Sequence, residues 1–213
     1  TLREAINSAN AIAGFDSIVF DSSLFSSQQT IGLNLGQLNI TDSLSINAPS
    51  FVTVSGNQAS RVFEIAAGAT VNLSGLIIAD GKVFDDKGAG IKSSGNLTLE
   101  NTIVRNNSVE YNLDDIFGTS GKGGGIYNSG ENLTVINSTI RDNEARLGGG
   151  IYNYGNNVIV TNSTIRDNDG RGIYNYGDNV RVTNSTIRDT EDGCIFNSGY
   201  GGRLMNMLIR CCS

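Results

Sequence analysis

Charged side chains gather in three segments of the sequence, near residues 80–90, 106–123 and 142–148. Carboxylates that meet across these segments could ligate calcium, which takes about six to eight oxygen ligands, or act as the acid and base that cleave a glycosidic bond. A lyase would pair calcium-held carboxylates with an arginine or lysine base. The alternative is that these acidic loops are simply solvated, which we favour. The catalytic candidates are Asp85, Asp86, Arg105, Asp114, Asp115 and Arg146, and the four aspartates are also the calcium candidates.

Other catalytic chemistries lack the residues that they need. The sequence contains no histidine, so the commonest general base and all imidazole metal ligands are missing. It also contains no Cys-x-x-Cys pair, no glycine-rich phosphate loop leading into a helix, and no recurring calcium nonapeptide. Carboxylate chemistry is therefore the one catalytic class that the sequence leaves open.

Aromatic residues offer a second kind of site, because several tyrosines recur at fixed places in a repeat. An aromatic strip can hold sugar rings, but rings that stack in register also stabilise a sheet by themselves. We favour the structural role for these tyrosines. The ligand-binding candidates are Glu110, Tyr111, Tyr127, Tyr152, Tyr154, Tyr174 and Tyr176.

The repeat itself decides the fold. GGGIYN occurs twice, GRGIYN and DGCIFN follow, and NSTIRD occurs three times between and after them. The spacing between equivalent isoleucines is 25, 22 and 22 residues in both motifs, so the strands keep their register while the turns vary in length, as in a solenoid. The two isoleucine columns are Ile126, Ile151, Ile173 and Ile195, and Ile140, Ile165, Ile187 and Ile209.

Three short strands of period two in each repeat predict parallel sheets around an aliphatic core. We therefore expect an all-β, right-handed parallel β-helix over residues 13–213, with roughly seven coils, in a single domain of residues 1–213. The inward pattern continues upstream through Ile77 and Ile103. One corner of successive coils should carry an asparagine ladder, made of Asn128, Asn153, Asn175 and Asn197.

The two ends of the solenoid differ. Leu2, Ala5, Ile6 and Ala9 fall on one face at helical spacing, so residues 1–12 should form an amphipathic capping helix over the first coil. No comparable segment follows the last repeat strand, and a removed domain, a disulfide-bonded tail or a second copy of the chain could cover it. We expect a homo-oligomer, formed by tail-to-tail association of two copies through the uncapped C-terminal coil. The three cysteines, Cys194, Cys211 and Cys212, lie in this coil, and their pairing stays open.

Charge and hydropathy exclude two classes of partner. The formal net charge of −6 repels phosphate backbones, so nucleic acid is not an expected partner. No apolar run approaches the roughly 20 residues needed to cross a bilayer, so we expect no membrane insertion.

The motifs resemble those of a bacterial extracellular β-helix family that opens with a Cys-Ser-Leu-Arg-Glu-Ala-like segment, since residues 1–6 read TLREAI. The GGGI corners and the IRDN segments are also similar to the repeats of polymorphic outer-membrane proteins. The resemblance implies an extracellular or cell-surface location. The leading hypothesis is a non-catalytic protein for adhesion, carbohydrate binding or assembly, whose partner is a polysaccharide or cell-surface glycan. The alternative is a polysaccharide lyase or glycoside hydrolase that uses the lateral loops.

Overall fold

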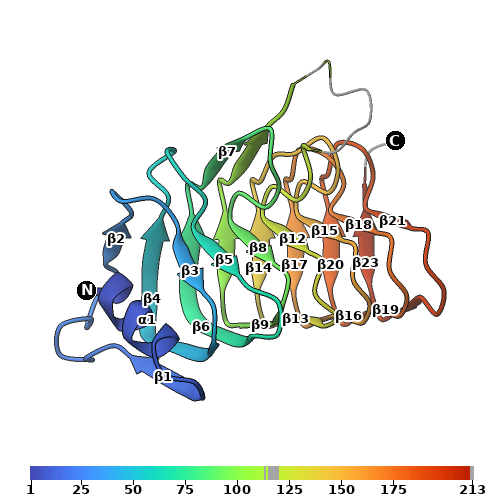
Figure 1. The fold of residues 1–213 in the computed structure, drawn as a ribbon. Helices are drawn as coiled ribbons and strands as arrows, with labels where there is room; N and C mark the ends of the chain where they lie inside the picture. Colours follow the sequence, from blue (N-terminus) through green and yellow to red (C-terminus); the bar gives the residue numbers. More distant parts are fainter. Residues whose placement is uncertain (113, 115–119, 212–213) are drawn as a thin grey trace.

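The strands of the chain stack along one axis, from the N-terminal helix at one end to the C-terminal coil at the other (Figure 1). The computed structural model describes residues 1–112, 114 and 120–211. It is a right-handed parallel β-solenoid of about eight turns, against the roughly seven expected, and it confirms the predicted fold class. No helix within the described ranges is long and apolar enough to span a membrane.

The capping helix α1 (Leu2–Asn10) lies at the N-terminal end, as the sequence predicts. Thr1 and Glu4 form a capping box, in which the Thr1 hydroxyl accepts a hydrogen bond from the Glu4 amide. Leu2, Ile6 and Ala9 are buried against the first coil. The helix therefore covers the end of the core that the first coil would otherwise expose.

Each coil contributes a strand to three faces, and all strand pairs between coils are parallel. The first face runs along the corner motif and carries the side chains that concern the site below. Its strands are β3 (Leu38–Ile40), β5 (Phe63–Ile65), β8 (Ile91–Ser93), β12 (Ile126–Asn128), β15 (Ile151–Asn153), β18 (Ile173–Asn175) and β21 (Ile195–Asn197).

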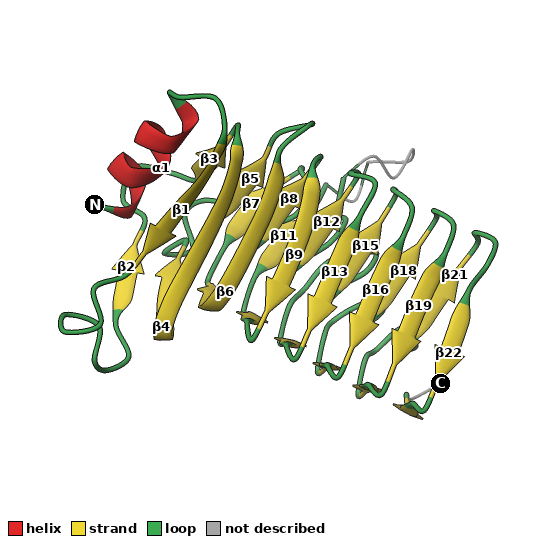
Figure 2. Ribbon diagram, turned by 90° about the horizontal axis from the view of Figure 1, so that it is seen from below, coloured by secondary structure: helices red, strands yellow, loops and turns green. Residues whose placement is uncertain are grey.

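The second face lies toward the viewer in Figure 2. Two long strands, β4 and β6, bend from this face into the third. The strands of the second face are β1 (Phe15–Val19), β4 (Ser43–Ser55), β6 (Thr70–Ala79), β9 (Asn96–Glu100), β13 (Leu133–Ile136), β16 (Val158–Thr161), β19 (Val180–Thr183) and β22 (Arg203–Met205).

The third face begins with β2, which pairs with the second half of β4. A separate parallel pair, β7 (Lys82–Phe84) with β11 (Ser108–Glu110), stands beside it on the lateral loops. Besides the second halves of β4 and β6, the strands of the third face are β2 (Thr30–Gly32), β10 (Ile103–Arg105), β14 (Thr139–Arg141), β17 (Thr164–Arg166), β20 (Thr186–Arg188) and β23 (Leu208–Arg210).

The turn between the second and third faces explains why NST recurs. Asn137, Asn162 and Asn184 have φ of 49°, 51° and 49°, in the left-handed region. Asparagine tolerates this conformation better than other side-chain-bearing residues. The repeated asparagine therefore serves the turn.

Ladders of side-chain amides run along the buried corners. The Asn128 Nδ2 atom donates to Asn153 Oδ1 over 2.7 Å, and the bonds from Asn153 to Asn175 and from Asn175 to Asn197 have the same length. This confirms the predicted ladder. A second ladder, which we did not predict, joins Asn107, Asn143 and Asn168 over 2.9 and 3.0 Å.

The predicted register of the upstream inward column is wrong by one residue. Ile103 pairs with Thr139, and it is Val104 that pairs with Ile140 and is fully buried. Ile77 likewise pairs with Ile103, while Ile78 continues the inward column. These segments contain consecutive apolar residues, so alternation alone does not say which of them points inward.

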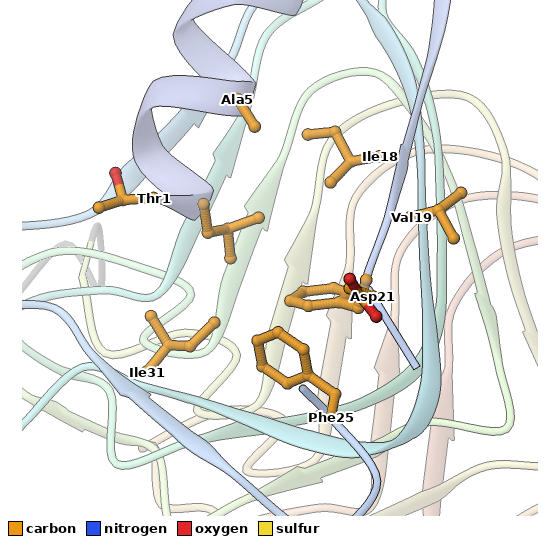
Figure 3. Close-up of a pocket in the computed structure, with 9 residues that line it drawn as sticks. Thr1, Ala5, Ile18, Val19, Asp21, Phe25 and Ile31 are labelled. Carbon is orange, nitrogen blue, oxygen red and sulfur yellow. The ribbon is translucent and has the colours of Figure 1, made fainter. Parts of the chain in front are cut away.

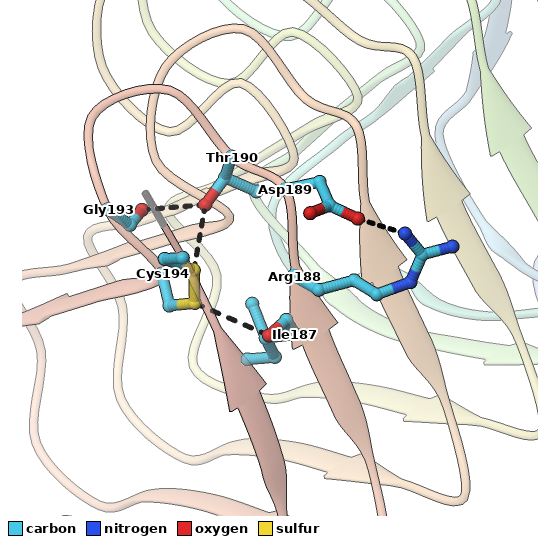
Figure 4. The surroundings of a disulfide bond; sticks show 7 residues. Ile187, Arg188, Asp189, Thr190, Gly193 and Cys194 are labelled. Carbon is cyan, nitrogen blue, oxygen red and sulfur yellow. Dashed lines mark hydrogen bonds and ion pairs between the residues drawn. A yellow bond between two sulfur atoms is a disulfide. The ribbon is translucent and has the colours of Figure 1, made fainter. Parts of the chain in front are cut away.

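A disulfide bond joins Cys194 to Cys211. It ties the end of β23 to the residue that precedes β21. Figure 4 shows Cys194 beside Thr190, whose hydroxyl donates to the Gly193 carbonyl over 2.9 Å. This bond is one of the covers expected for the C-terminal end. Leu204 and Leu208 of the last coil are nevertheless exposed. Cys212 lies outside the described residues, and tail-to-tail association stays a prediction.

Candidate functional site

The lateral loops form an ordered stack of their own. Val83, Ala89, Val109 and Ala145 pack into a small cluster, separate from the main core. Isolated parallel β-bridges join Lys87 to Lys122 and Lys122 to Leu147, one coil further along in each case. The loops therefore present side chains from neighbouring coils at one edge of the first face.

Three of the four aspartates predicted to bind calcium lie among the described residues, and these three do not gather into a metal site. Asp85 is exposed at a turn with φ of 54°, and Asp86 pairs with Arg61. Asp114 is exposed, and Asp115 lies outside the described residues. Among residues 1–112, 114 and 120–211 there is no group of three or more His, Cys, Asp or Glu side chains that could hold a metal ion.

Arg61 organises the charges at this edge, although the sequence did not single it out. Its side chain is 4% exposed, and the guanidinium donates to the Gly88 carbonyl over 2.8 Å and to Gln37 Oε1 over 2.6 Å. It also pairs with the carboxylates of Glu64 and Asp86. A buried guanidinium with this many acceptors is fully satisfied, so it holds the loop in place and is unsuited to act as a base.

The remaining loop candidates are dispersed. Arg105 lies on the third face, where it pairs in register with Ala79 and Arg141. Glu110 forms an exposed ion pair with Lys82 over 2.6 Å. Arg105 is thus part of a strand of the third face, whereas the other described lyase candidates lie on the lateral loops.

Arg146 and Tyr111 do come together, with the guanidinium carbon 5.9 Å from the ring centroid. They line a small pocket with Glu144, Asp169 and Asp192. The pKa of Asp169 is raised, by partial burial first and then by the neighbouring carboxylates of Glu191 and Asp192. These last carboxylates were missed because they lie outside the long loops.

The predicted aromatic column forms a continuous stack on the outer surface of the first face. The ring centroids of Tyr127 and Tyr152 are 5.6 Å apart and those of Tyr152 and Tyr174 are 5.3 Å apart, with interplanar angles of 11° and 13°. Phe196 extends the stack, 4.4 Å from Tyr174. The ring faces therefore cover one another, and Tyr152 is only 3% exposed. This arrangement supports a structural role for the stacked rings.

Tyr154 and Tyr176 differ from the stacked rings, because they present aromatic surface to solvent. Their exposed fractions are 64% and 46%, and their centroids are 6.4 Å apart. Tyr176 also contacts Tyr152 and Tyr174, at 6.1 and 5.5 Å between centroids. The two exposed rings thus form a rim on one side of the stack.

Cations lie over the same column of rings. The Lys87 ammonium is 5.3 Å from the centroid of Tyr127, and the Lys122 ammonium is 5.4 Å from that of Tyr152. The Arg171 guanidinium lies 5.5 Å from Tyr174 and 5.4 Å from Phe196. Burial raises the pKa of the Tyr152 hydroxyl well above its usual range, so this hydroxyl stays neutral. We call these rings and cations, together with Tyr154 and Tyr176, the aromatic stripe.

A separate apolar pocket of about 420 Å³ lies between α1 and the first coil. Figure 3 shows Ala5, Ile18 and Ile31 around it, with Asp21 at its border. Its lining is almost wholly aliphatic and aromatic, and it contains a single carboxylate side chain. It therefore lacks the paired groups that acid–base chemistry requires.

Comparison with known proteins bears on the fold. Residues 115–209 match the family model of the right-handed β-helix region. No curated protein and no solved structure matches the chain. The family match and the parallel solenoid together support placing this chain among the β-helix repeat proteins.

Proposed function

We propose that this chain is a non-catalytic, extracellular or cell-surface β-helix protein that binds a polysaccharide or cell-surface glycan through the aromatic stripe. The observation that carries the proposal is the pair of exposed rings, Tyr154 and Tyr176, beside an immobilised stack. Sugar rings bind to aromatic surface that is already ordered, because little conformational entropy is then lost on binding.

The setting of these two rings supports binding. Tyr176 contacts the rings of Tyr152 and Tyr174, so its position is restricted before any ligand arrives. Phenolic hydroxyls along the stripe can donate and accept hydrogen bonds. The stripe therefore combines apolar ring surface with polar groups, as glycan sites require.

The location outside the cell rests on the resemblance of TLREAI at residues 1–6 to the opening motif of a bacterial extracellular family. A disulfide within the last coil is in keeping with this location, because such bonds persist in oxidising compartments.

The test is a binding screen of the intact chain against neutral and acidic polysaccharides, by affinity electrophoresis followed by calorimetry. The double variant Tyr154→Ala/Tyr176→Ala should lose most of the affinity and keep the melting temperature. Phe15→Ala is the control, because Phe15 is 59% exposed on β1, at the far end of the second face. Absence of binding to every polysaccharide, or equal loss in the control, contradicts the proposal.

A second candidate function is polysaccharide cleavage, the alternative considered above. The pKa of Asp169 is raised, and Asp169 lines one pocket with Arg146, which favours this function because a general acid works better when its pKa is shifted toward neutral pH. Reducing-end and unsaturated-sugar assays, with and without added calcium, test this function. Product formation that is lost in Asp169→Asn would replace the binding proposal by an enzymatic one.

A further inference from the structure

We infer that the ligand is an acidic polysaccharide, which lies along the solenoid axis with its anionic groups against Lys87, Lys122 and Arg171. This inference rests on the proposed glycan-binding function and names its ligand class. It is carried by the order of the cations along the stripe, by the local charge balance, and by the spacing of the coils.

The cations follow the rings in register. Lys87 lies over Tyr127, and Lys122 lies over Tyr152, one coil further along. Arg171 lies over both Tyr174 and Phe196, which belong to the next two coils. Three cations therefore accompany the four levels of the stack from β12 to β21, and the last two levels share Arg171.

The charge of the stripe is opposite in sign to that of the whole chain. Lys92 and Arg61, at the N-terminal end of the same surface, are offset by the carboxylates of Glu64 and Asp86. Among the described residues, neither Lys87 nor Arg171 has a carboxylate within ion-pair distance. A protein with a formal charge of −6 thus carries two cations on this face, Lys87 and Arg171, that no carboxylate of the described residues neutralises.

The spacing suits a chain of sugars. Neighbouring parallel strands lie about 4.8 Å apart, and an extended polysaccharide advances by a similar length with each ring. A polymer with one carboxylate or sulfate on each sugar would therefore meet a cation at three successive levels of the stack, those of Tyr127, Tyr152 and Tyr174. The Arg171 guanidinium can bind a carboxylate through two hydrogen bonds, whereas the lysines act as point charges.

The partly buried setting strengthens this attraction. Lys87, Lys122 and Arg171 are all partly buried beside aromatic rings, where charges are screened less than on an open surface. The rings also hold the cations near one line, which reduces the side-chain entropy lost on binding.

The experiment compares polygalacturonate with its fully methyl-esterified form, because both have the same backbone and the ester has no carboxylates. Alginate and dextran sulfate, against dextran, extend the comparison. Calorimetry should show affinity at least about tenfold higher for the acidic polymer of a pair, and weaker binding as salt is added. The triple variant Lys87→Gln/Lys122→Gln/Arg171→Gln should lose this difference.

The matched control is Arg141→Gln/Arg166→Gln/Arg188→Gln, which removes the same charge from the third face, where each arginine pairs with the following aspartate. It should bind as the unaltered chain does. Equal affinity for acidic and neutral polymers, or equal loss in both triple variants, overturns the inference. If neutral polymers bind through Tyr154 and Tyr176, the proposed function stands and the acidic ligand class fails. If no polysaccharide binds, both fail.

Discussion

The outer surface of the first face is held together by charges at its N-terminal half and by rings at its C-terminal half. In β5 and β8 the outward column carries Glu64 and Lys92, which are 3.2 Å apart. From β12 onward the same column carries Tyr127, Tyr152 and the rings that follow. The backbone register is continuous across the junction.

The difference teaches that one backbone lattice accepts two kinds of outward packing with different sensitivities. Charges around Arg61 stabilise only while every partner is present and ionised. Stacked rings depend on contact area, which salt and moderate pH leave unchanged. The two halves should therefore respond differently to substitution, acid and salt.

The largest loss of stability is expected from a substitution in the inward column, because both halves pack on this buried column. Ile151 is fully buried in β15, between Ile126 and Ile173. Ile151→Asp places an unpaired charge between coils and should cost more than about 4 kcal/mol in the free energy of unfolding. Urea denaturation measures this cost. A variant that keeps its melting temperature within a degree or two would refute the assigned register.

Next in size is the removal of Arg61. Arg61→Ala leaves Glu64 and Asp86 without their central partner and should cost about 3 kcal/mol, at the lower end of the range for buried pairs because both carboxylates are a third or more exposed. Circular dichroism during thermal melting would report it. Added salt should change the cost of this substitution, and a cost independent of salt would argue against the charge network.

A substitution in the aromatic half should lower the free energy of unfolding by less than the removal of Arg61 does. Tyr152→Ala removes two stacking contacts and should cost about 2 kcal/mol, with little dependence on salt. Tyr152→Phe keeps the stack and should leave the free energy of unfolding nearly unchanged. A large cost for the phenylalanine variant would mean that the hydroxyl, and not the ring, is the stabilising group.

Acid should separate the two halves. For Glu64, burial raises the pKa, but hydrogen bonds from Gln37 and Lys92 and nearby positive charges outweigh burial and leave the pKa lowered. The pKa of Asp86 is also lowered, because the hydrogen bond and the positive charge of Arg61 outweigh the effect of burial. Their stabilisation is complete above their ordinary values, 4.5 and 3.8, and is lost as pH falls through the lower folded-state values. Urea denaturation at falling pH should therefore show Glu64→Gln/Asp86→Asn approaching the unaltered chain in stability.

The smallest expected effect has the opposite sign. The raised pKa of Asp169 means that its ionised form is less stable in the folded chain. Asp169→Asn should therefore raise the free energy of unfolding at pH 7, by less than about 1 kcal/mol because the site is exposed. The gain should vanish as pH falls below the ordinary value of 3.8. Destabilisation at neutral pH would contradict this assignment.

The sequence predicted those features that depend on repetition. Strict alternation around Ile126 and Ile151 determined which residues face inward, and the recurring corner asparagine indicated the ladder. The segment around Ile103 was misjudged because adjacent apolar residues give no alternation. The second ladder left a signal, since Asn143 and Asn168 follow the same motif, but we did not recognise it.

The site was less predictable, because its contacts cross the repeat. Arg61 binds Gln37 and Asp86, which lie 24 and 25 residues away outside any motif. The sequence placed the stacked tyrosines in one column, yet it could not show that their faces cover each other while Tyr154 and Tyr176 stay exposed. Three cysteines allow three pairings, so the bond between Cys194 and Cys211 needed coordinates.

Coils of 22 residues are interchangeable building units. The side-chain hydrogen bonds from Asn153 to Asn175 and from Asn175 to Asn197 both join residues 22 positions apart and have the same length. A tandem copy of residues 170–191 would place each side chain on its own duplicate, so it would make contacts that the chain already makes. Such duplication can lengthen the protein one coil at a time without new side-chain chemistry. Each added coil would also bring further copies of Arg171, Tyr174 and Tyr176, so chain length would set the valency of the stripe, and avidity would rise with it.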